Sequence, residues 1–256
     1  MSNSKNTRKS SYAVPAVDAM LDIVEHLADH KEPRGVSQLA RELGLSTNIV
    51  FRVMKRLVER GYATMDESSS YQLGSHFFTL GMKLYSRFDL RRQARMFLCE
   101  LSAECGETCQ LQVPDGDHML AAEVITPDSD YYMQVVPGSR VYYHANAFGK
   151  CVLAHLPEAD LQEIMDKGLP PLTPNTIITP EALLTELENI RQTGIAHDRN
   201  EYVLGVYCLG APVFDHQGKV VAGIGITGLS SRLDSERITA LEPKVKSCAA
   251  AISKAM

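Results

Sequence analysis

The sequence GLSTNIVFRVMKRLVERGY, residues 44–62, carries the clearest folding signal in this chain. Ser46 is a residue type that caps helices, and the spacing after it predicts a helix to about Arg60, with Gly61 ending it. At about 100° per residue, the apolar residues of this helix fall on one side: Val50, Val53, Met54 and Leu57. The opposite side is polar and mainly basic, with Asn48, Arg52, Lys55 and Glu59, flanked by Phe51 and Arg56. The helix therefore has one side to bury and a cationic side to present.

Two further helices are expected before this one. The first starts near Val14 and carries an apolar stripe at steps of three and four residues, made of Val17, Met20, Leu21, Val24 and Leu27. A second, shorter helix is predicted over 36–43, and Gly44 follows it where a left-handed turn needs a glycine. The second helix is thus joined to the third by a turn of only a few residues, which is typical of a helix-turn-helix.

Two short strands complete this part of the chain. YATM, residues 62–65, and YQLG, residues 71–74, surround an acidic and serine-rich turn, which favours a hairpin. We therefore predict a winged helix-turn-helix DNA-binding domain over 14–74, preceded by a flexible basic arm over 1–13. A three-helix bundle whose basic face is merely solvated would produce much the same periodicity, so this alternative stays open.

The charges of the chain are unevenly distributed. The 256 residues carry a formal net charge of −5, but residues 1–95 hold 15 Lys and Arg against 10 Asp and Glu. Residues 96–256 hold 11 Lys and Arg against 21 Asp and Glu. This division indicates that one part meets a polyanion and that the other does not touch it. Because 45% of the residues are apolar, the composition excludes disordered and collagen-like chains.

The sequence contains no signal for a membrane or for export. No apolar run approaches the roughly 20 residues that cross a bilayer, and the first twenty residues lack the apolar core of a secretory signal. We therefore expect a soluble cytoplasmic protein. The six cysteines are dispersed and are expected to be reduced thiols: Cys99, Cys105, Cys109, Cys151, Cys208 and Cys248.

The remainder of the chain alternates helical and β-rich patterns. Residues 75–105 keep a helical rhythm, which predicts a linker helix over 75–90 joined to a second domain, 91–256, with the boundary near 88–90. Strands are expected at 109–113, 118–125, 131–136, 202–215 and 219–228, the last two joined by a turn at 216–218. Helices are expected at 147–156, 158–167, 180–193 and 234–255. Meandering strands with helices between and after them indicate an α+β fold.

Three stretches together resemble the IclR family of bacterial transcriptional regulators. They are residues 44–62 followed by YQLG, PGSRVYYHANAFGKCVLAHL (137–156), and the run from Asp198 through EYVLGVYCLGAPVFD to ITG (226–228). The resemblance extends from about Val14 to Ile252 and implies an N-terminal winged helix-turn-helix and a C-terminal GAF-like domain that binds a small effector. Similar proteins bind DNA as dimers or pairs of dimers, with subunit contacts at helices around the linker. They respond to small organic acids, including 2-oxo acids, sugar acids and aromatic acids.

The sequence departs from the family pattern at several places. The family usually has Pro-Leu where this chain has Tyr142 and Tyr143, Thr where it has Asn146, and Leu where it has Phe148. These positions lie near the expected pocket, so the class of effector is left open. A basic residue commonly stands in the place of Thr47, which bears on the operator sequence that is read.

The cationic side of the third helix has the chemistry to read DNA. Arg52 has the planar fork that hydrogen-bonds O6 and N7 of guanine, and Asn48 has the donor and acceptor that match adenine. Phosphate or base-edge contacts that set the register are expected from Thr47, Lys55 and Arg56. Ser46 and Phe51 complete the predicted DNA-binding residues. The alternative for Arg52 is a surface ion pair with Glu59 or with another carboxylate.

The resemblance assigns the effector to seven residues of the second domain: Ala147, Phe148, Gly149, Asp198, Cys208, Gly225 and Thr227. Their types make physical sense. Residues 225 and 227 share one face of a strand, so that Gly225 leaves space while the Thr227 hydroxyl donates a hydrogen bond. The N–H groups of residues 147–149, at the start of a predicted helix, are placed to hold a carboxylate. The alternative is that Cys208 and Thr227 are ordinary core residues.

Catalytic and metal sites have weaker support. Cys99, Cys105 and Cys109 lack the spacing of a structural zinc site, and no phosphate-binding glycine motif occurs. His144 with Cys151 or Cys208 would suggest a thiol hydrolase, but no nucleophile signature surrounds either cysteine. We therefore expect neither an enzyme, nor a metal, nor a cofactor.

These observations together predict a ligand-responsive transcriptional regulator, a repressor controlled by a small organic acid. Its partners would be a palindromic double-stranded DNA operator and a further copy of itself, as a homodimer or a dimer of dimers, with no membrane. Two alternatives stay open: an architectural DNA-binding protein that senses no ligand, and a thiol-dependent enzyme.

Overall fold

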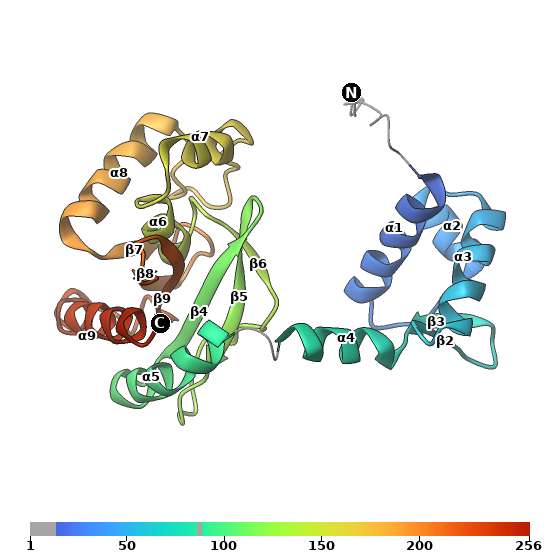
Figure 1. The fold of residues 1–256 in the computed structure, drawn as a ribbon, viewed down its shortest axis with the longest axis horizontal. Coiled ribbons are helices and arrows are strands. Elements are labelled where there is room, and N and C mark those ends of the chain that lie inside the picture. The colour runs from blue at the N-terminus through green and yellow to red at the C-terminus, as the bar shows by residue number, and fades with distance from the viewer. Residues whose placement is uncertain (1–13, 86–88) are drawn as a thin grey trace. The chain divides into compact units, whose positions relative to one another are not determined.

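The computed structural model describes residues 14–85 and 89–256, and for residues 84, 85 and 89 it describes the backbone alone. The chain divides into two compact units between residues 87 and 88 (Figure 1). The expected basic arm, 1–13, lies outside the described residues, and so do residues 86–88, which belong to the expected linker and domain boundary. Each unit has a hydrophobic core of its own.

The first unit, over residues 14–85, is a helix-turn-helix with a small sheet and a further helix. In chain order its elements are α1 (Pro15–Asp29), β1 (Arg34–Gly35), α2 (Val36–Leu43), α3 (Thr47–Glu59), β2 (Ala63–Met65), β3 (Ser70–Leu73) and α4 (Ser75–Tyr85). The antiparallel sheet has the order β1-β3-β2, and the hairpin of β2 and β3 is the wing. The predicted winged helix-turn-helix is thus confirmed. The prediction did not include β1, because a strand of two residues shows no alternation.

The turn between α2 and α3 is built as the sequence predicts. Gly44 adopts a φ of +67° and its N–H donates to the Ala40 carbonyl, while Ser46 Oγ caps α3 by accepting from the Ile49 N–H at 3.4 Å. The apolar side of α3 is buried against α1 and α2, as expected. Its buried residues are Val50, Val53, Met54 and Leu57.

The apolar stripe expected on the first helix is partly wrong. Val17 and Leu21 are 47% and 49% exposed, and the residues that α1 buries are Ala19, Ile23 and Leu27. The two apolar residues therefore lie on the outer side of the helix. Three-residue steps alone did not show which edge of a wide stripe faces the core.

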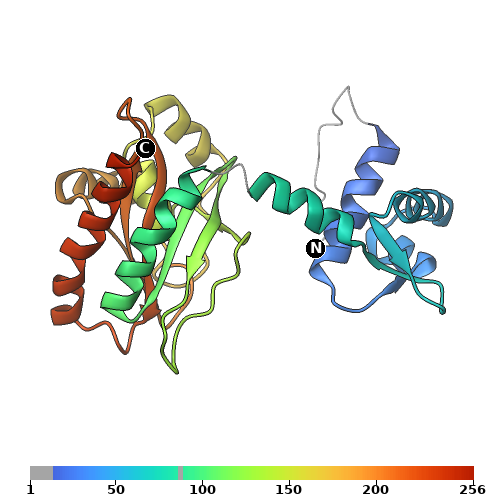
Figure 2. The same cartoon turned by 60° about the horizontal axis from the view of Figure 1, so that its bottom comes forward.

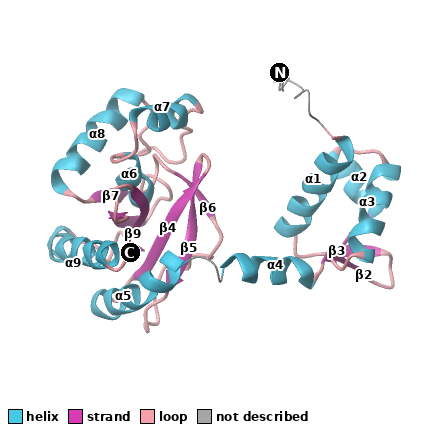
Figure 3. Ribbon diagram, in the orientation of Figure 1, coloured by secondary structure: helices cyan, strands magenta, loops and turns pink. Residues whose placement is uncertain are grey.

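The second unit is a six-stranded antiparallel sheet with helices on both faces (Figures 1 and 3). The strand order is β6-β5-β4-β9-β8-β7. Over residues 89–256 its elements are α5 (Asp89–Cys105), β4 (Thr108–Asp115), β5 (His118–Ile125), β6 (Arg140–Tyr142), α6 (Ala147–Leu153), α7 (Glu158–Asp166), α8 (Pro180–Thr193), β7 (Ala196–Arg199), β8 (Val206–Phe214), β9 (Val220–Leu229) and α9 (Ser235–Lys254). The chain as a whole therefore has the α+β architecture that the sequence predicts.

The two faces of the sheet have separate cores. On one face, α5 and α9 lie side by side (Figure 2) and share a core with alternate residues of β4, β8 and β9. On the other face, α6 packs directly on β8 and β9, and α8 packs on α6. Glycines allow this close approach: a Cβ at Gly210 would lie 2.7 Å from the Ala147 carbonyl carbon, and one at Gly223 would lie 2.5 Å from the Phe148 carbonyl oxygen.

Several strand assignments need correction. Residues 131–136 are not a strand but part of the loop between β5 and β6. The strand that pairs with β5 at this edge of the sheet is β6. The side chains of residues 131–136 favour a strand locally, yet Thr108 Oγ1 donates to the Met133 carbonyl at 2.6 Å and holds this loop against the sheet. β8 starts at Val206 instead of 202, since Asn200 and Gly205 turn the chain there with φ of +63° and +85°. The short strand β7 lies outside the prediction.

Within the described residues, no helix has both the length and the apolar character that a membrane span requires. The six cysteines are free thiols, of which Cys99 is exposed and the other five are buried.

Candidate functional site

The polar side of α3 is open to solvent. All seven residues expected at the DNA surface are exposed: Ser46, Thr47, Asn48, Phe51, Arg52, Lys55 and Arg56. The carboxylate of Glu59 pairs with Arg56 at 2.8 Å and does not pair with Arg52. Among the described residues, the structure records no ion pair for Arg52. Asn48 and Arg52 are four residues apart on one helix face, so both side chains project from the same side.

An apolar groove lies beside this helix in the first unit. Its volume is about 840 Å³, and it is bordered by the start of α1, by α3 and by Phe77 of α4. Several large apolar side chains on α1 and α4 are also exposed: Val17, Leu21, Phe78, Leu80 and Met82. Soluble proteins rarely leave so many apolar side chains uncovered in one region, and such surfaces mark interaction sites.

The second unit contains a cavity of about 300 Å³ on the α6 side of its sheet. It brings together four of the seven residues that the resemblance assigns to the effector: Phe148, Asp198, Cys208 and Thr227. The strand register explains this grouping. Asp198 lies opposite Cys208, and Cys208 lies opposite Thr227, so β7, β8 and β9 present a row of side chains on one face.

The other three residues do not line the cavity. The N–H of Gly149 is already taken, because it donates to Asn146 Oδ1 at 2.8 Å in the cap of α6. Gly225 leaves no space for a ligand: a Cβ there would overlap the carbonyl oxygen of Leu209 on the neighbouring strand. Ala147 is fully buried against the sheet. The sequence indicates that these residues lie close to the cavity. It does not show whether a small residue leaves room for a ligand or lets two backbone segments pack closely.

Two glutamines line the cavity that the sequence analysis did not identify. Gln112 Nε2 donates to Gln110 Oε1 at 2.9 Å, and Gln110 Nε2 donates to Thr227 Oγ1 at 2.7 Å. Both side chains are buried, at 2% and 4% exposure for Gln110 and Gln112. The sequence CQLQV, residues 109–113, contained a signal for these two residues, because its two glutamines alternate with apolar residues and so share one face of the strand. Both faces of this strand are covered in the structure, so the glutamine face is polar and buried.

Burial controls the acid–base state of the cavity. It raises the pKa of Asp198 to about 6, and it raises the pKa of the Cys208 thiol well above its ordinary value. Cys208 is therefore a neutral thiol, hydrogen-bonded to Thr227 at an Sγ–Oγ1 distance of 3.4 Å. A buried neutral thiol is a poor nucleophile.

The other cysteines considered in the sequence lie in the following surroundings. The His144 ring hydrogen-bonds the Pro170 carbonyl at 3.1 Å, and burial raises the pKa of Cys151. Cys105 and Cys109 lie 3.9 Å apart, sulfur to sulfur, within the core under α5. In the part of the chain that the structure describes, no three His, Cys, Asp or Glu side chains are grouped to hold a metal ion.

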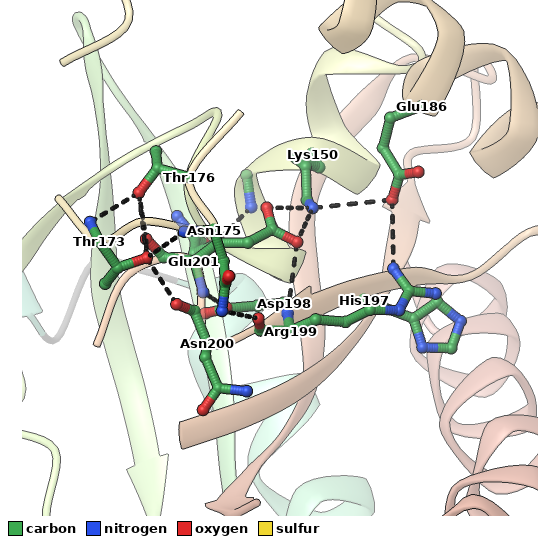
Figure 4. Close-up of polar contacts among 12 residues, drawn as sticks. Lys150, Thr173, Asn175, Thr176, Glu186, His197, Asp198, Arg199, Asn200 and Glu201 are labelled. Atoms are coloured by element: carbon green, nitrogen blue, oxygen red, sulfur yellow. Dashed lines mark hydrogen bonds and ion pairs between the residues drawn. The ribbon is translucent and has the colours of Figure 1, made fainter. Parts of the chain in front are cut away.

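A buried ion pair holds the turn that follows Asp198 at the end of β7 (Figure 4). Lys150 of α6 is fully buried, and its Nζ lies 2.7 Å and 2.5 Å from the two carboxylate oxygens of Glu201. The Glu201 N–H donates to Asp198 Oδ1 at 2.7 Å, and its carbonyl accepts from Thr176 Oγ1 at 2.6 Å. The turn after β7 is thereby fixed from both sides, which places Tyr202 at the cavity wall.

Both units match models of one protein family. Residues 16–67 match the IclR helix-turn-helix domain, and residues 82–254 match the bacterial transcriptional regulator IclR C-terminal domain. The chain is 29% identical over 243 residues to the HTH-type transcriptional repressor AllR of Escherichia coli K12, covering 94% of this chain and 90% of AllR.

Solved structures agree with these matches. The crystal structure of the Thermotoga maritima IclR aligns with a TM-score of 0.77 at 30% identity, covering 93% of this chain and 97% of that one. An IclR homologue from Microbacterium hydrocarbonoxydans, complexed with 4-hydroxybenzoate, aligns with a TM-score of 0.81 at 19% identity, covering 94% of this chain and 98% of that one. The chain belongs to the IclR family: it is a DNA-binding transcriptional regulator with an effector-binding C-terminal domain, and not an enzyme.

Proposed function

We propose that this regulator is a repressor that acts in the cytoplasm and whose affinity for operator DNA is set by a small organic acid in the C-terminal cavity. The observation that carries this proposal is the cavity of about 300 Å³, which is lined by a row of polar residues in a unit separate from the DNA-reading helix. AllR, a relative of similar length, is a repressor. The Microbacterium homologue was crystallised with an aromatic acid.

The exposed side of α3 supports specific reading of the operator. Arg52 would hydrogen-bond guanine and Asn48 adenine, each contributing about 1–3 kcal/mol of discrimination between bases. The surrounding exposed residues would contact phosphates or base edges and set the register: Ser46, Thr47, Phe51, Lys55 and Arg56.

The exposed apolar side chains of α1 and α4 support assembly into a homodimer, or a dimer of dimers, through the first unit. In a dimer the two α3 helices would read a palindromic operator, with half-sites about 34 Å apart or at a multiple of that distance. The effector would act by changing the relative placement of the two recognition helices.

The acid would bind along the polar row. Asp198, Cys208, Thr227 and the first turn of α6 at Phe148 border the same space. Near neutral pH a fraction of Asp198 is protonated, because its pKa is about 6, and a protonated carboxyl group can donate a hydrogen bond to a carboxylate.

Titration of operator binding with candidate acids tests the proposal. An acid that raises the melting temperature of the protein should also shift operator affinity, and operator DNA should change the affinity for that acid by the same factor, because coupling is reciprocal. If an acid binds without any shift, the allosteric proposal fails. If 2-oxo, sugar and aromatic acids all fail to raise the melting temperature, the chain is better described as an architectural DNA-binding protein.

A further inference from the structure

A chain of hydrogen bonds crosses the floor of the cavity from β8 to β4. Cys208 contacts Thr227, Thr227 accepts from Gln110, and Gln110 in turn accepts from Gln112. Each member lies on the α6 side of the sheet, since Gln110 is opposite Gly225 and Gln112 is opposite Gly223 in the strand register. The amides are therefore fixed relative to one another before any ligand enters.

This chain ends on an unsatisfied atom. Gln112 Oε1 is buried and accepts no hydrogen bond within the described part of the chain. The residues opposite Gln112 on the adjoining strands are Gly223 and Ala121, and neither has a polar side chain to offer. A buried acceptor without a donor lowers the stability of the fold, and native proteins contain few such atoms. A hydrogen-bond donor is therefore expected to occupy the space beside Gln112 Oε1.

The charged groups around the cavity do not supply that partner. Arg140, the one basic residue that contributes to the described cavity wall, directs its guanidinium to Asp115, with Nε 2.9 Å from Oδ2 and Nη2 3.0 Å from the carbonyl oxygen. Lys150 is engaged by Glu201. Asp198, at the far end of the floor, uses Oδ1 to accept from the Glu201 N–H. The Gln112 end of the floor thus offers an acceptor.

We propose that Gln112 Oε1 accepts a hydrogen bond from a hydroxyl group of the effector, so that the effector is a hydroxylated carboxylic acid rather than a 2-oxo acid or an unsubstituted acid. This inference rests on the proposed function, namely that the cavity binds an acid. Gln112 is then a specificity-determining residue, because an acid without the hydroxyl leaves its carbonyl oxygen buried and unpaired.

Matched acids test this inference on the full-length wild-type protein by isothermal titration calorimetry. The sets are lactate, pyruvate and propionate; gluconate and hexanoate; and 4-hydroxybenzoate, 4-fluorobenzoate and benzoate. In a set that binds, the hydroxylated acid should bind at least about tenfold more tightly, the range expected for a hydrogen bond whose loss strands a buried group. The oxo and fluoro acids, which only accept hydrogen bonds, should bind no better than the unsubstituted acids.

A pair of variants assigns the preference to one amide. Gln112→Met removes the acceptor at similar side-chain length and should reduce the preference to within about twofold. Gln162→Met changes the same residue type on the exposed side of α7, where the amide donates to Asp166 outside the cavity, and should keep the tenfold preference. If Gln112→Met does not fold, the comparison of matched acids on the wild-type protein still tests whether the effector must carry a hydroxyl group.

Three results would overturn the inference. They are equal affinity for hydroxylated and unsubstituted acids, acceptor-only acids that bind as tightly as hydroxylated ones, and a preference that survives in Gln112→Met. The second result would mean that the Gln112 amide turns its N–H to the ligand. If acids bind and shift operator affinity without this preference, only the inference fails; if no acid in any set binds, the proposed acid sensing fails with it.

Discussion

Single side chains of α3 are expected to contribute differently to DNA binding, some to sequence discrimination and others to general attraction for the phosphates. Arg52 has a planar fork and is recorded with no ion pair among the described residues, whereas Lys55 presents a point charge from the same helix. Arg56 is partly neutralised by Glu59 at 2.8 Å. We therefore expect Arg52 to discriminate between bases, and its basic neighbours to contact phosphates and so fix the position of the helix along the DNA.

Arg52→Ala should abolish specific operator binding, with a loss of about 1–3 kcal/mol of discrimination per guanine contact. Fluorescence anisotropy with operator and scrambled duplexes measures this loss, and thermal unfolding should be unchanged because the side chain is exposed. Lys55→Ala is the matched control: it should weaken binding to both duplexes equally and reduce the salt dependence. Retained sequence preference in Arg52→Ala would refute its assignment.

Asp198 should make stability depend on pH. Burial raises its folded pKa to about 6 from an unfolded value of 3.8, so the fold favours the protonated form. The stability that this group contributes is therefore present below about pH 4 and is lost as pH rises through 6, by up to about 3 kcal/mol. Urea unfolding at pH 4 and pH 7 should show Asp198→Asn gaining on wild type by about that amount, since the amide keeps an oxygen for the Glu201 N–H. A difference between variant and wild type that does not change with pH would contradict this.

The helix α6 and the turn after β7 are joined by the Lys150–Glu201 pair, which ties two elements 51 residues apart in sequence. A backbone hydrogen bond from the Asn200 N–H to the Val206 carbonyl, at 3.1 Å, closes this turn beside the sheet, and the ion pair adds a side-chain link to α6. The pair therefore contributes to the shape of the cavity wall. Removing either partner should lower the stability of the fold, because the remaining charge would be buried and unpaired.

Lys150→Met should destabilise the protein by about 3–5 kcal/mol, because it leaves the Glu201 carboxylate buried without its cation. The double variant Lys150→Met, Glu201→Gln should recover part of that loss. Lys167→Met is the matched control, since Lys167 makes an exposed pair with Glu163 at 3.1 Å, and it should cost under about 1 kcal/mol. Urea unfolding measures all three; equal costs for the two lysines would show that the buried pair has no special role.

The whole molecule is expected to work as an assembly, because the exposed apolar side chains of α1 and α4 belong to the unit that also carries α3. A monomer would leave this surface in water and would present one recognition helix to a palindrome. Dimer formation would bury the apolar surface and double the DNA contacts.

Leu21→Glu and Phe78→Glu should therefore shift the protein toward monomers in sedimentation velocity and weaken operator binding. Both residues are exposed in the single chain, at 49% and 71%, so the first unit should still fold. Leu184→Glu, on α8 of the second unit, alters an apolar residue that is 43% exposed and should leave the assembly unchanged. Variants of α1 and α4 that sediment like wild type would exclude this surface as the contact.

Local patterns in the chain were sufficient for the DNA-reading half. The Ser46 cap, the Gly44 turn and the apolar side of α3 depend on interactions between residues a few positions apart, and helical periodicity reports such interactions directly. The same arithmetic identified the exposed face with Asn48 and Arg52. It was less reliable for Val17 and Leu21, whose orientation depends on what the rest of the unit covers.

The cavity could not be derived in this way, because its walls come from distant parts of the chain. Gln110 bonds to Thr227 across 117 residues, and β4 becomes the neighbour of β9 only when the sheet forms. Alternation along a strand shows which residues share a face but not which strand lies next to it, and it cannot show that the space beside Gly225 is filled by backbone. Folding of the whole second unit therefore determined which polar groups meet, and which buried amide oxygen was left without a donor.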